Sequence, residues 1–143
     1  ISYIPQKIYI LNDTIRNNLV FANDQINIDE NDLGNILNIV KLNDLIKDNK
    51  KKFNTAISDA TFKASEGEIQ RFGIARALLQ KKEILILDEI TSSLDQKNEK
   101  NIMNIVRGLK GSSTIIMISH KNSSLEFCDK VYTVHNKNLL SSK

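Results

Sequence analysis

The sequence predicts an α/β fold in which helices flank a mainly parallel sheet. Two short aliphatic runs, at 84–87 and 114–118, are typical of strands that helices cover on both faces. Residues 66–80 and 96–107 carry apolar side chains at helical spacing. Strands and helices that alternate in this way indicate a parallel sheet, and 143 residues are enough to build one core around it.

The first half of the chain should be largely helical after one short strand. That strand covers 2–4 and ends at the chain's only proline. Asp13 can cap a short helix that follows it. A longer helix is expected between about 27 and 40, where apolar residues recur at helical spacing. Residues 42–46 should add one helical turn, and the polar, basic residues 47–56 indicate a surface connection.

The second half should alternate helices with the two aliphatic strands. The helix at 66–80 presents a broad apolar face, and the helix at 96–107 should close at Gly108. A third, shorter strand is expected at 131–134, and the last residues should form a frayed tail.

Bulk composition argues against several classes of function. The net charge is only +3. No aromatic residues interleave with the lysine clusters at 50–52 and 81–82 to stack bases, so no nucleic-acid partner is expected. No apolar run approaches the roughly 20 residues of a membrane-spanning helix, and the first residues do not form a signal peptide. The single cysteine, Cys128, excludes an internal disulfide.

Polar side chains follow three of the expected strands. Gln6 comes shortly after the first strand. Asp88 and Glu89 close the run at 84–87, and His120 closes the next strand. Open α/β sheets bind ligands at the carboxyl edge of their strands. Two adjacent carboxylates at that edge predict a site for phosphate and Mg²⁺, because a hard cation prefers carboxylate and water oxygens.

Five segments in this order resemble the ATP-binding cassette (ABC) family of ATPases. YIPQ at 3–6 is similar to the glutamine loop, and ASEGE at 64–68 is similar to the signature loop. ILILDE at 84–89 is similar to the Walker B strand, and SSLD at 92–95 is similar to the D-loop. ISH at 118–120 is similar to the histidine switch. The resemblance covers nearly the whole chain, and the order of the motifs makes it specific. It implies a P-loop NTPase-like ABC cassette with an α-helical subdomain.

The resemblance also implies roles for the residues at the carboxyl edge. Asp88 would hold Mg²⁺, and Gln6 would reach the same metal and the attacking water. Glu89 would be the catalytic base that orients and polarises this water. His120 would be a second catalytic residue, in contact with the γ-phosphate. ATP and Mg²⁺ are therefore the expected cofactors, and the expected reaction is ATP hydrolysis.

The signature loop is implied to bind the ATP held by a second nucleotide-binding domain, through Ser65, Gly67 and Glu68. Asp95 of the D-loop is a further expected cofactor-binding residue. Ser65-x-x-Glu68 is also a capping box at a helix start, which favours anions. The family pattern is Leu-Ser-Gly-Gly-Gln, so Glu66 and Glu68 add two acids. We expect Glu66 to point away and Glu68 to cap the helix, which leaves a signature that is competent but weak.

The phosphate-binding loop of the family, Gly-x-x-x-x-Gly-Lys-Ser/Thr, does not occur in the sequence. We therefore expect a C-terminal portion of a longer polypeptide, lacking the Walker A strand, loop and helix and inactive as an isolated fragment. Its expected parts are a strand and glutamine loop at 1–6, an α-helical subdomain with signature loop and helix at 7–80, and part of the catalytic core with Walker B, D-loop and H-loop at 81–143.

The expected function is that of the nucleotide-binding domain of an ABC exporter, an ATPase that works as a head-to-tail dimer. DTIRNNL at 13–19 is similar to an exporter stretch. Residues 58–61 keep only the acid, Asp59, of a Gly-Glu-x-Gly coupling segment. Two alternatives stay open: a soluble ABC ATPase of DNA repair, chromosome organisation or translation, and a non-catalytic truncated remnant.

The exporter interpretation also predicts partners and a location. One partner would be a transmembrane domain of the same longer chain or of a half-transporter. The other would be a second nucleotide-binding domain, identical or different. The chain would then lie at the cytoplasmic face of the inner or plasma membrane, attached through a membrane domain that these residues do not include.

Overall fold

The computed structural model describes residues 1–21, 28–47, 52–57 and 64–141. Its strands are β1 (Ser2–Ile4), β2 (Asp13–Thr14), β3 (Ala56–Ile57), β4 (Ile84–Asp88), β5 (Thr114–Ile118), β6 (Tyr132–His135) and β7 (Asn138–Ser141). Its helices are α1 (Ile15–Val20), α2 (Glu30–Ile39), α3 (Asp44–Lys47), α4 (Glu66–Leu79), α5 (Gln96–Gly108) and α6 (Asn122–Leu125), and η1 (Lys52–Asn54) is a 3₁₀ turn. None of these helices in the described ranges is long and apolar enough to cross a membrane.

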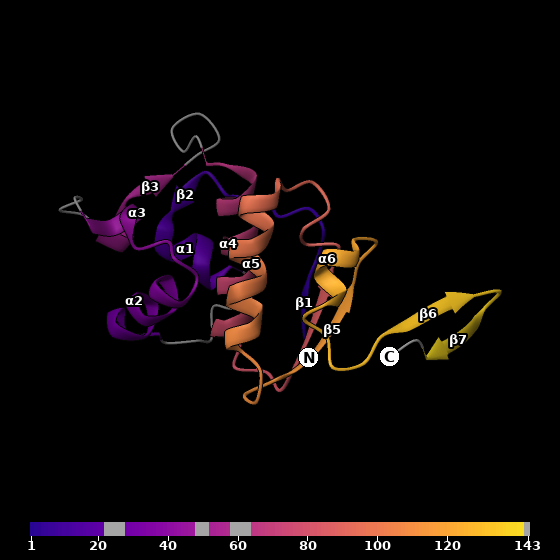
Figure 1. Cartoon of the computed structure of the whole chain (residues 1–143). Coiled ribbons are helices and arrows are strands. Elements are labelled where there is room, and N and C mark those ends of the chain that lie inside the picture. The colour runs from indigo at the N-terminus through magenta and orange to yellow at the C-terminus, as the bar shows by residue number, and fades with distance from the viewer. Residues whose placement is uncertain (22–27, 48–51, 58–63, 142–143) are drawn as a thin grey trace.

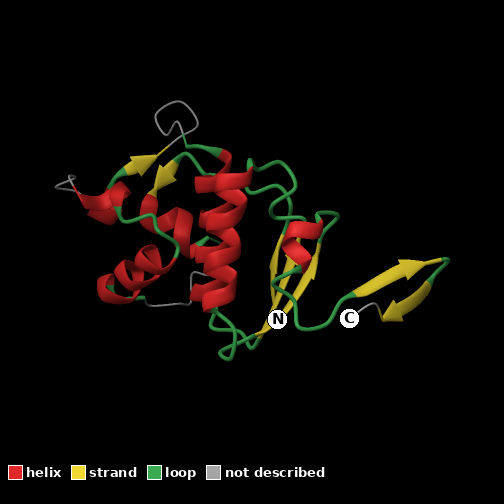
Figure 2. Ribbon diagram, in the orientation of Figure 1, coloured by secondary structure: helices red, strands yellow, loops and turns green. Residues whose placement is uncertain are grey.

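A three-stranded parallel sheet in the order β1-β4-β5 forms the centre of the fold. Ile4 pairs with Leu87, and Asp88 pairs with Ile118, so the three strands end at the same edge. Figure 1 shows α4 and α5 on one side of this sheet and the β6–β7 hairpin extending away on the other. Figure 2 shows all helices except α6 gathered on the α4 side. The predicted α/β fold with a parallel sheet is confirmed.

α4 begins at the predicted capping box and is the most enclosed helix of the fold. The Ser65 hydroxyl accepts a hydrogen bond of 3.3 Å from the backbone N–H of Glu68, and the Glu68 carboxylate accepts one of 2.8 Å from the backbone N–H of Ser65. The helix is buried nearly all round rather than on one broad face, because α1, α2, α5 and β1 all pack against it. Gly73 permits close packing, since a Cβ there would lie 2.6 Å from Cδ1 of Ile8.

The second face of the main sheet is only partly covered in the described part of the chain. Leu85 and Leu87 are buried, but the residues that alternate with them along β4, Ile84, Ile86 and Asp88, are half-buried. On β5, Ile116 and Ile118 are 50% and 48% exposed. The prediction that helices cover both faces of these strands is therefore wrong for the described residues, because α4 and α5 lie on one side.

Two predicted helix ends are shifted. Thr14, not Asp13, is the N-cap of α1, because the Thr14 hydroxyl accepts the N–H of Asn17 at 3.1 Å. Asp13 instead accepts the N–H of Thr14 at 2.6 Å. α5 includes Gly108 as its last residue, and the left-handed glycine comes later, at Gly111 with φ +86°.

The predicted frayed tail is instead the second strand of a hairpin. β6 and β7 pair antiparallel and are joined by Asn136 and Lys137, whose φ values are +50° and +63°. Two left-handed residues make the tight turn that matches strand twist, and asparagine in that position is the signal that could have predicted it. Within the expected connection at 47–56, η1 forms and β3 begins at Ala56. The coupling segment expected at 58–61 lies outside the described residues.

Candidate functional site

Three polar side chains meet where the strands of the main sheet end. Gln6 follows β1, Glu89 follows β4 and His120 follows β5. The Gln6 amide nitrogen donates to Oε2 of Glu89 at 3.1 Å, and Nε2 of His120 lies 2.8 Å from Oε1 of Glu89. The structure thus brings these three predicted site residues together, with Glu89 in the middle.

The backbone fixes Glu89 at this edge. Its φ of +48° is left-handed, a strained conformation for a residue with a Cβ and one that clusters at functional sites. Its N–H donates to the Ile118 carbonyl at 3.0 Å, so the turn after β4 is tied to the end of β5. The Glu89 side chain is 24% exposed and that of His120 is 85% exposed, so the site opens to solvent on the histidine side.

Asp88 and Gln6 have further partners that the sequence analysis missed. The Tyr3 hydroxyl donates to Oδ2 of Asp88 at 2.6 Å, and this hydrogen bond raises the pKa of Tyr3, so the phenol remains a donor. Tyr3 pairs with Ile86, two residues before Asp88, which places both side chains on one face of the sheet. The Gln6 amide also donates to the Ser92 hydroxyl at 3.0 Å.

The side-chain oxygen atoms at this edge are of the kind that Mg²⁺ binds. Asp88 and Gln6 offer carboxylate and amide oxygens, and Mg²⁺ commonly takes one or two protein carboxylates and completes its shell with water and phosphate. Within the described ranges, no group of three or more His, Cys, Asp or Glu is arranged to hold a metal.

A second group of predicted residues lies at the N-terminus of α4. Ser65 and Glu68 form the capping box, in which Glu68 also accepts the Ser65 hydroxyl at 2.9 Å. Gly67 is buried against α5, and a Cβ there would lie 2.8 Å from Oδ1 of Asn98. Glu66 is exposed. Glu68 is therefore used in capping, as its place in the sequence predicts, and Glu66 carries its charge at the surface.

Asp95 is the N-cap of α5, and the Asn98 side chain lies between Asp95 and Gly67. Its carboxylate accepts the N–H of Asn98 at 2.8 Å and the Asn98 amide at 3.0 Å. The backbone hydrogen bond from Asn98 is the main cause that lowers the pKa of Asp95. Asn98 therefore joins the start of α4 to the predicted D-loop.

Gln70 connects α4 to the carboxyl edge. It is 6% exposed, and its amide donates to the Gln6 carbonyl at 2.6 Å. Its own Oε1 is buried without a hydrogen-bond partner in the described residues. Gln70 is not among the site residues predicted from the sequence, although a polar side chain among the apolar ones of a buried helix is a recognisable signal. The position of Gln6 therefore depends on α4.

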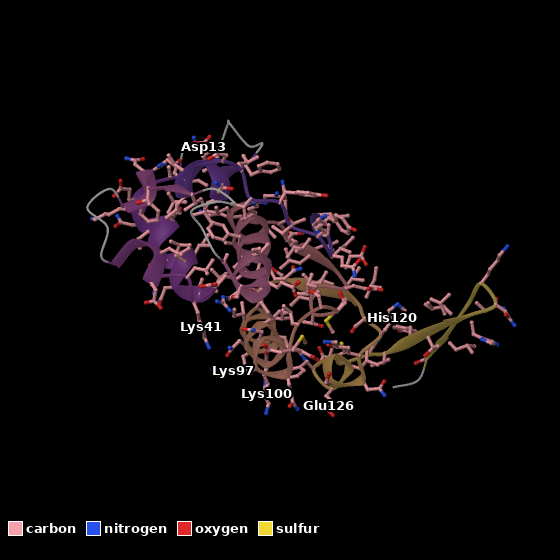
Figure 3. The ribbon with its side chains drawn as sticks, turned by 90° about the horizontal axis from the view of Figure 1, so that it is seen from above. Asp13, Lys41, Lys97, Lys100, His120 and Glu126 are labelled. Carbon is pink, nitrogen blue, oxygen red and sulfur yellow. The ribbon has the colours of Figure 1, made fainter. Side chains whose placement is uncertain are left out.

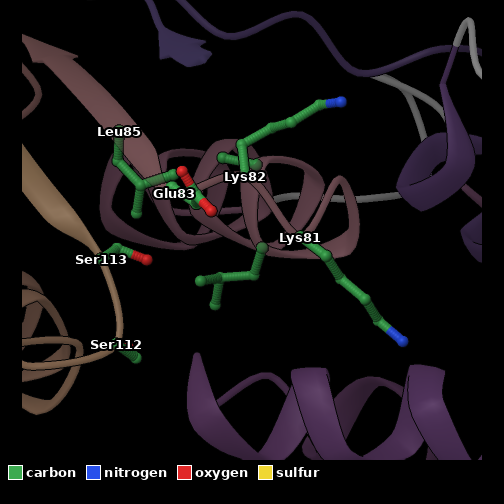
Figure 4. Close-up of a pocket in the computed structure, with 8 residues that line it drawn as sticks. Lys81, Lys82, Glu83, Leu85, Ser112 and Ser113 are labelled. Carbon is green, nitrogen blue, oxygen red and sulfur yellow. The ribbon is translucent and has the colours of Figure 1, made fainter.

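A hollow lies at the other end of the sheet. It has a volume of about 270 Å³ and is lined by Ala77, Leu78, Lys81, Lys82, Glu83, Leu85, Ser112 and Ser113. Figure 4 shows Lys81 and Lys82 extending away from the two serines. Figure 3 shows His120 and Asp13 in separate parts of the molecule. None of the predicted site residues lines the hollow, so it is separate from the candidate site.

The comparisons with known proteins agree with this architecture. The sequence profile described as ABC transporter matches residues 1–92. An ATP-dependent lipid A-core flippase of Pseudoalteromonas translucida is 33% identical over 139 residues, which are 97% of this chain and 24% of that protein. A glutathione/L-cysteine transport system ATP-binding/permease protein, CydC, of Haemophilus influenzae is 33% identical over 140 residues, which are 98% of this chain and 24% of that protein.

A solved structure extends the match in three dimensions. The structure of a bacterial Atm1-family ABC exporter with ATP bound has a TM-score of 0.79 and 27% identity, and the match covers 97% of this chain and 24% of that one. The chain spans about a quarter of the length of the curated relatives it matches. The profile match includes Gln6, the start of α4 and the Asp88–Glu89 pair. The family that the five motifs indicate is therefore confirmed, and this chain belongs to the ABC transporter family.

Proposed function

We propose that this chain is part of the nucleotide-binding domain of an ABC exporter, in which ATP binding and hydrolysis at a head-to-tail dimer drive substrate export. Glu89 carries the proposal: a strained turn holds it at the carboxyl edge, and both Gln6 and His120 contact it. In this proposal, 1–6 form the strand and glutamine loop, 7–80 the α-helical subdomain, and 81–143 the part of the catalytic core.

At the carboxyl edge, Glu89 is the proposed base for the attacking water. Gln6 donates to one of its carboxylate oxygens and His120 lies against the other, so the carboxylate is oriented from two sides. The His120 side chain is 85% exposed, and it is the proposed contact to the γ-phosphate. Asp88 and Gln6 are the proposed ligands of Mg²⁺, which neutralises phosphate charge when it is bound.

A second set of site residues lies at the N-termini of α4 and α5. We propose that they contact the ATP of the second domain; they are Ser65, Gly67, Glu68 and Asp95. The start of α4 presents backbone N–H groups and the positive end of the helix dipole, which favour phosphate. Gly67 lets the backbone approach closely. The two acids of the first turn, Glu66 and Glu68, oppose this by charge repulsion.

Removing the two acids should therefore strengthen ATP binding. We expect Glu66→Gly with Glu68→Gln to lower the KM for ATP about three- to thirtyfold, because each of the two charges beside the helix terminus changes the binding free energy by about 0.3–1 kcal/mol. Glutamine at 68 can still accept from Ser65, so the cap survives.

The measurement is ATP hydrolysis by the natural polypeptide that contains residues 1–143. Glu30→Gln, which removes the first acid of α2, should leave the KM unchanged. An unchanged KM in the double variant would contradict the weak-signature hypothesis.

The proposed partners follow from the relatives. One matched relative is named as a flippase and another as an ATP-binding/permease protein. This supports a transmembrane domain, in the same longer chain or in a half-transporter, as one partner. A second nucleotide-binding domain, identical or different, is the other. The chain would work at the cytoplasmic face of the inner or plasma membrane.

Reconstitution tests this function. The natural polypeptide, purified and placed in lipid vesicles, should hydrolyse ATP in a reaction that requires Mg²⁺ and depends on dimer formation. A folded polypeptide without ATPase activity would contradict the proposal and favour the non-catalytic alternative. A polypeptide that does not associate with vesicles, and whose ATPase activity responds to DNA or ribosomes, would favour the soluble alternative.

A further inference from the structure

Lys121, the residue after His120, joins three segments next to the candidate site. Its ammonium donates to the Thr91 carbonyl at 2.7 Å, to the Leu94 carbonyl at 3.0 Å and to the Glu99 carboxylate at 3.1 Å. An ammonium has three N–H donors, so these contacts use all of them. One cation therefore holds the loop between β4 and α5, the first turn of α5 and the segment after β5.

Glu99 is the buried anchor of this arrangement. The residue is 8% exposed, and its carboxylate accepts hydrogen bonds from Ser123, Ser124 and Lys121. Burial by itself would raise the pKa of Glu99, but the hydrogen bonds from Ser123 and Lys121 outweigh it and hold the pKa below its ordinary value. Ser124 also lies 3.2 Å from the Thr91 hydroxyl. The carboxylate is thus charged and fully partnered, which is the condition for a stable buried ion pair.

The position of His120 depends on contacts made by neighbouring residues of the chain. Its side chain is 85% exposed and contacts Glu89, so neighbouring side chains do not enclose it. Its position depends on the backbone on either side, where the Lys121 N–H donates to the Ser119 hydroxyl at 3.1 Å. Glu89, in turn, sits two residues before Thr91. The Lys121 ammonium therefore joins the backbone just after His120 to the backbone just after Glu89.

We propose that Lys121 and Glu99 form a positioning pair that holds His120 and Glu89 at contact distance. This inference deepens the proposed ATPase function and rests on it. The pair is not catalytic, because its contacts are to protein groups. It should act on turnover and leave ATP affinity unchanged. A purely structural ion pair would instead change stability and leave the contact between His120 and Glu89 intact.

The contact can be measured in the 143-residue chain without any ATP. The chain has two histidines, so the imidazole carbon–proton spectrum contains the signal of His120 and that of His135 on the distant hairpin as an internal control. Glu89→Gln should shift the His120 signal. Lys121→Met should move that signal toward the Glu89→Gln position, and adding Glu89→Gln to Lys121→Met should shift it little further. An equal Glu89→Gln shift with and without Lys121 would overturn the proposal.

Three further variants keep the result interpretable. Lys121→Arg retains donors for all three acceptors and should restore the wild-type His120 signal. Glu99→Gln keeps the shape of the anchor, leaves the two carbonyl contacts of Lys121 in place and should give an intermediate shift. Lys110→Met removes a surface ion pair with Asp129, which has a distance of 2.7 Å, and should not move the His120 signal. Failure of the arginine variant to restore the signal would count against the pair.

Kinetics of the natural polypeptide give the second readout. Lys121→Met should lower kcat about tenfold, because small misplacements of catalytic groups have effects of this order or larger, while the KM for ATP stays within about twofold. Lys121→Arg should recover most of kcat. Absence of ATPase activity in the wild-type polypeptide would contradict the proposed function, and the histidine spectra would still decide whether the pair positions His120. A normal kcat in Lys121→Met would overturn the positioning role.

Discussion

Replacing Glu89 with glutamine should lower kcat for ATP hydrolysis by the natural polypeptide about 10²- to 10⁴-fold, the usual contribution of a general base. Glutamine has the size of glutamate, and its one carbonyl oxygen can still accept a hydrogen bond from Gln6 or from His120. Its amide group cannot take a proton from water. The strained φ of +48° at this position is the same for both residues. The loss should therefore appear in kcat, with ATP binding retained.

The matched control lies at the opposite end of the same strand. Glu83 directly precedes β4, is exposed and lies apart from Gln6 and His120. Glu83→Gln removes the same charge from the same stretch of chain and should leave kcat unchanged. ATP affinity, measured by titration in both variants, should equal that of the wild type. If Glu89→Gln keeps more than about half of the wild-type kcat, Glu89 is not the base.

The edge that carries Glu89 could be predicted because its determinants are local. A run of aliphatic residues specifies a strand, and polar residues after successive parallel strands must meet at one edge. Gln6, Glu89 and His120 each follow directly from that rule. The capping box at Ser65 and Glu68 is equally local, since its partners are three residues apart. These features needed no knowledge of how distant segments pack.

The missed features all depend on packing between distant segments. Gln70 reaches the Gln6 carbonyl across 64 positions of the chain, and Lys121 reaches Glu99 across 22. The sequence shows a polar residue at each position, but not which partner the fold brings to it. The left-handed φ of Glu89 is likewise invisible, because a glycine or asparagine would be the usual signal for such a turn and neither is present.

Gly67→Ala is the variant for which local and tertiary effects oppose each other. Alanine in a helix is favoured over glycine by up to about 1 kcal/mol. At Gly67, however, the added Cβ would lie 2.8 Å from Oδ1 and 2.9 Å from Cγ of Asn98. Asn98 cannot turn away freely, because its amide and its N–H are both bonded to Asp95. We expect a net loss of about 1–2 kcal/mol in the free energy of unfolding, since overpacking typically costs about 1–3 kcal/mol. Urea unfolding of the 143-residue chain measures it.

Two companion variants separate the clash from the helix preference. Gly34 lies in α2 with nothing within 4 Å of a Cβ placed there, so Gly34→Ala should raise the free energy of unfolding by about 0.5–1 kcal/mol. Asn98→Ala removes the obstacle, and in that background Gly67→Ala should also become stabilising. The sign reversal tests the contact between α4 and α5 directly, because helix preference is the same in both backgrounds. A Gly67→Ala substitution that destabilises equally with and without Asn98 would show that Asn98 is not what keeps this position a glycine.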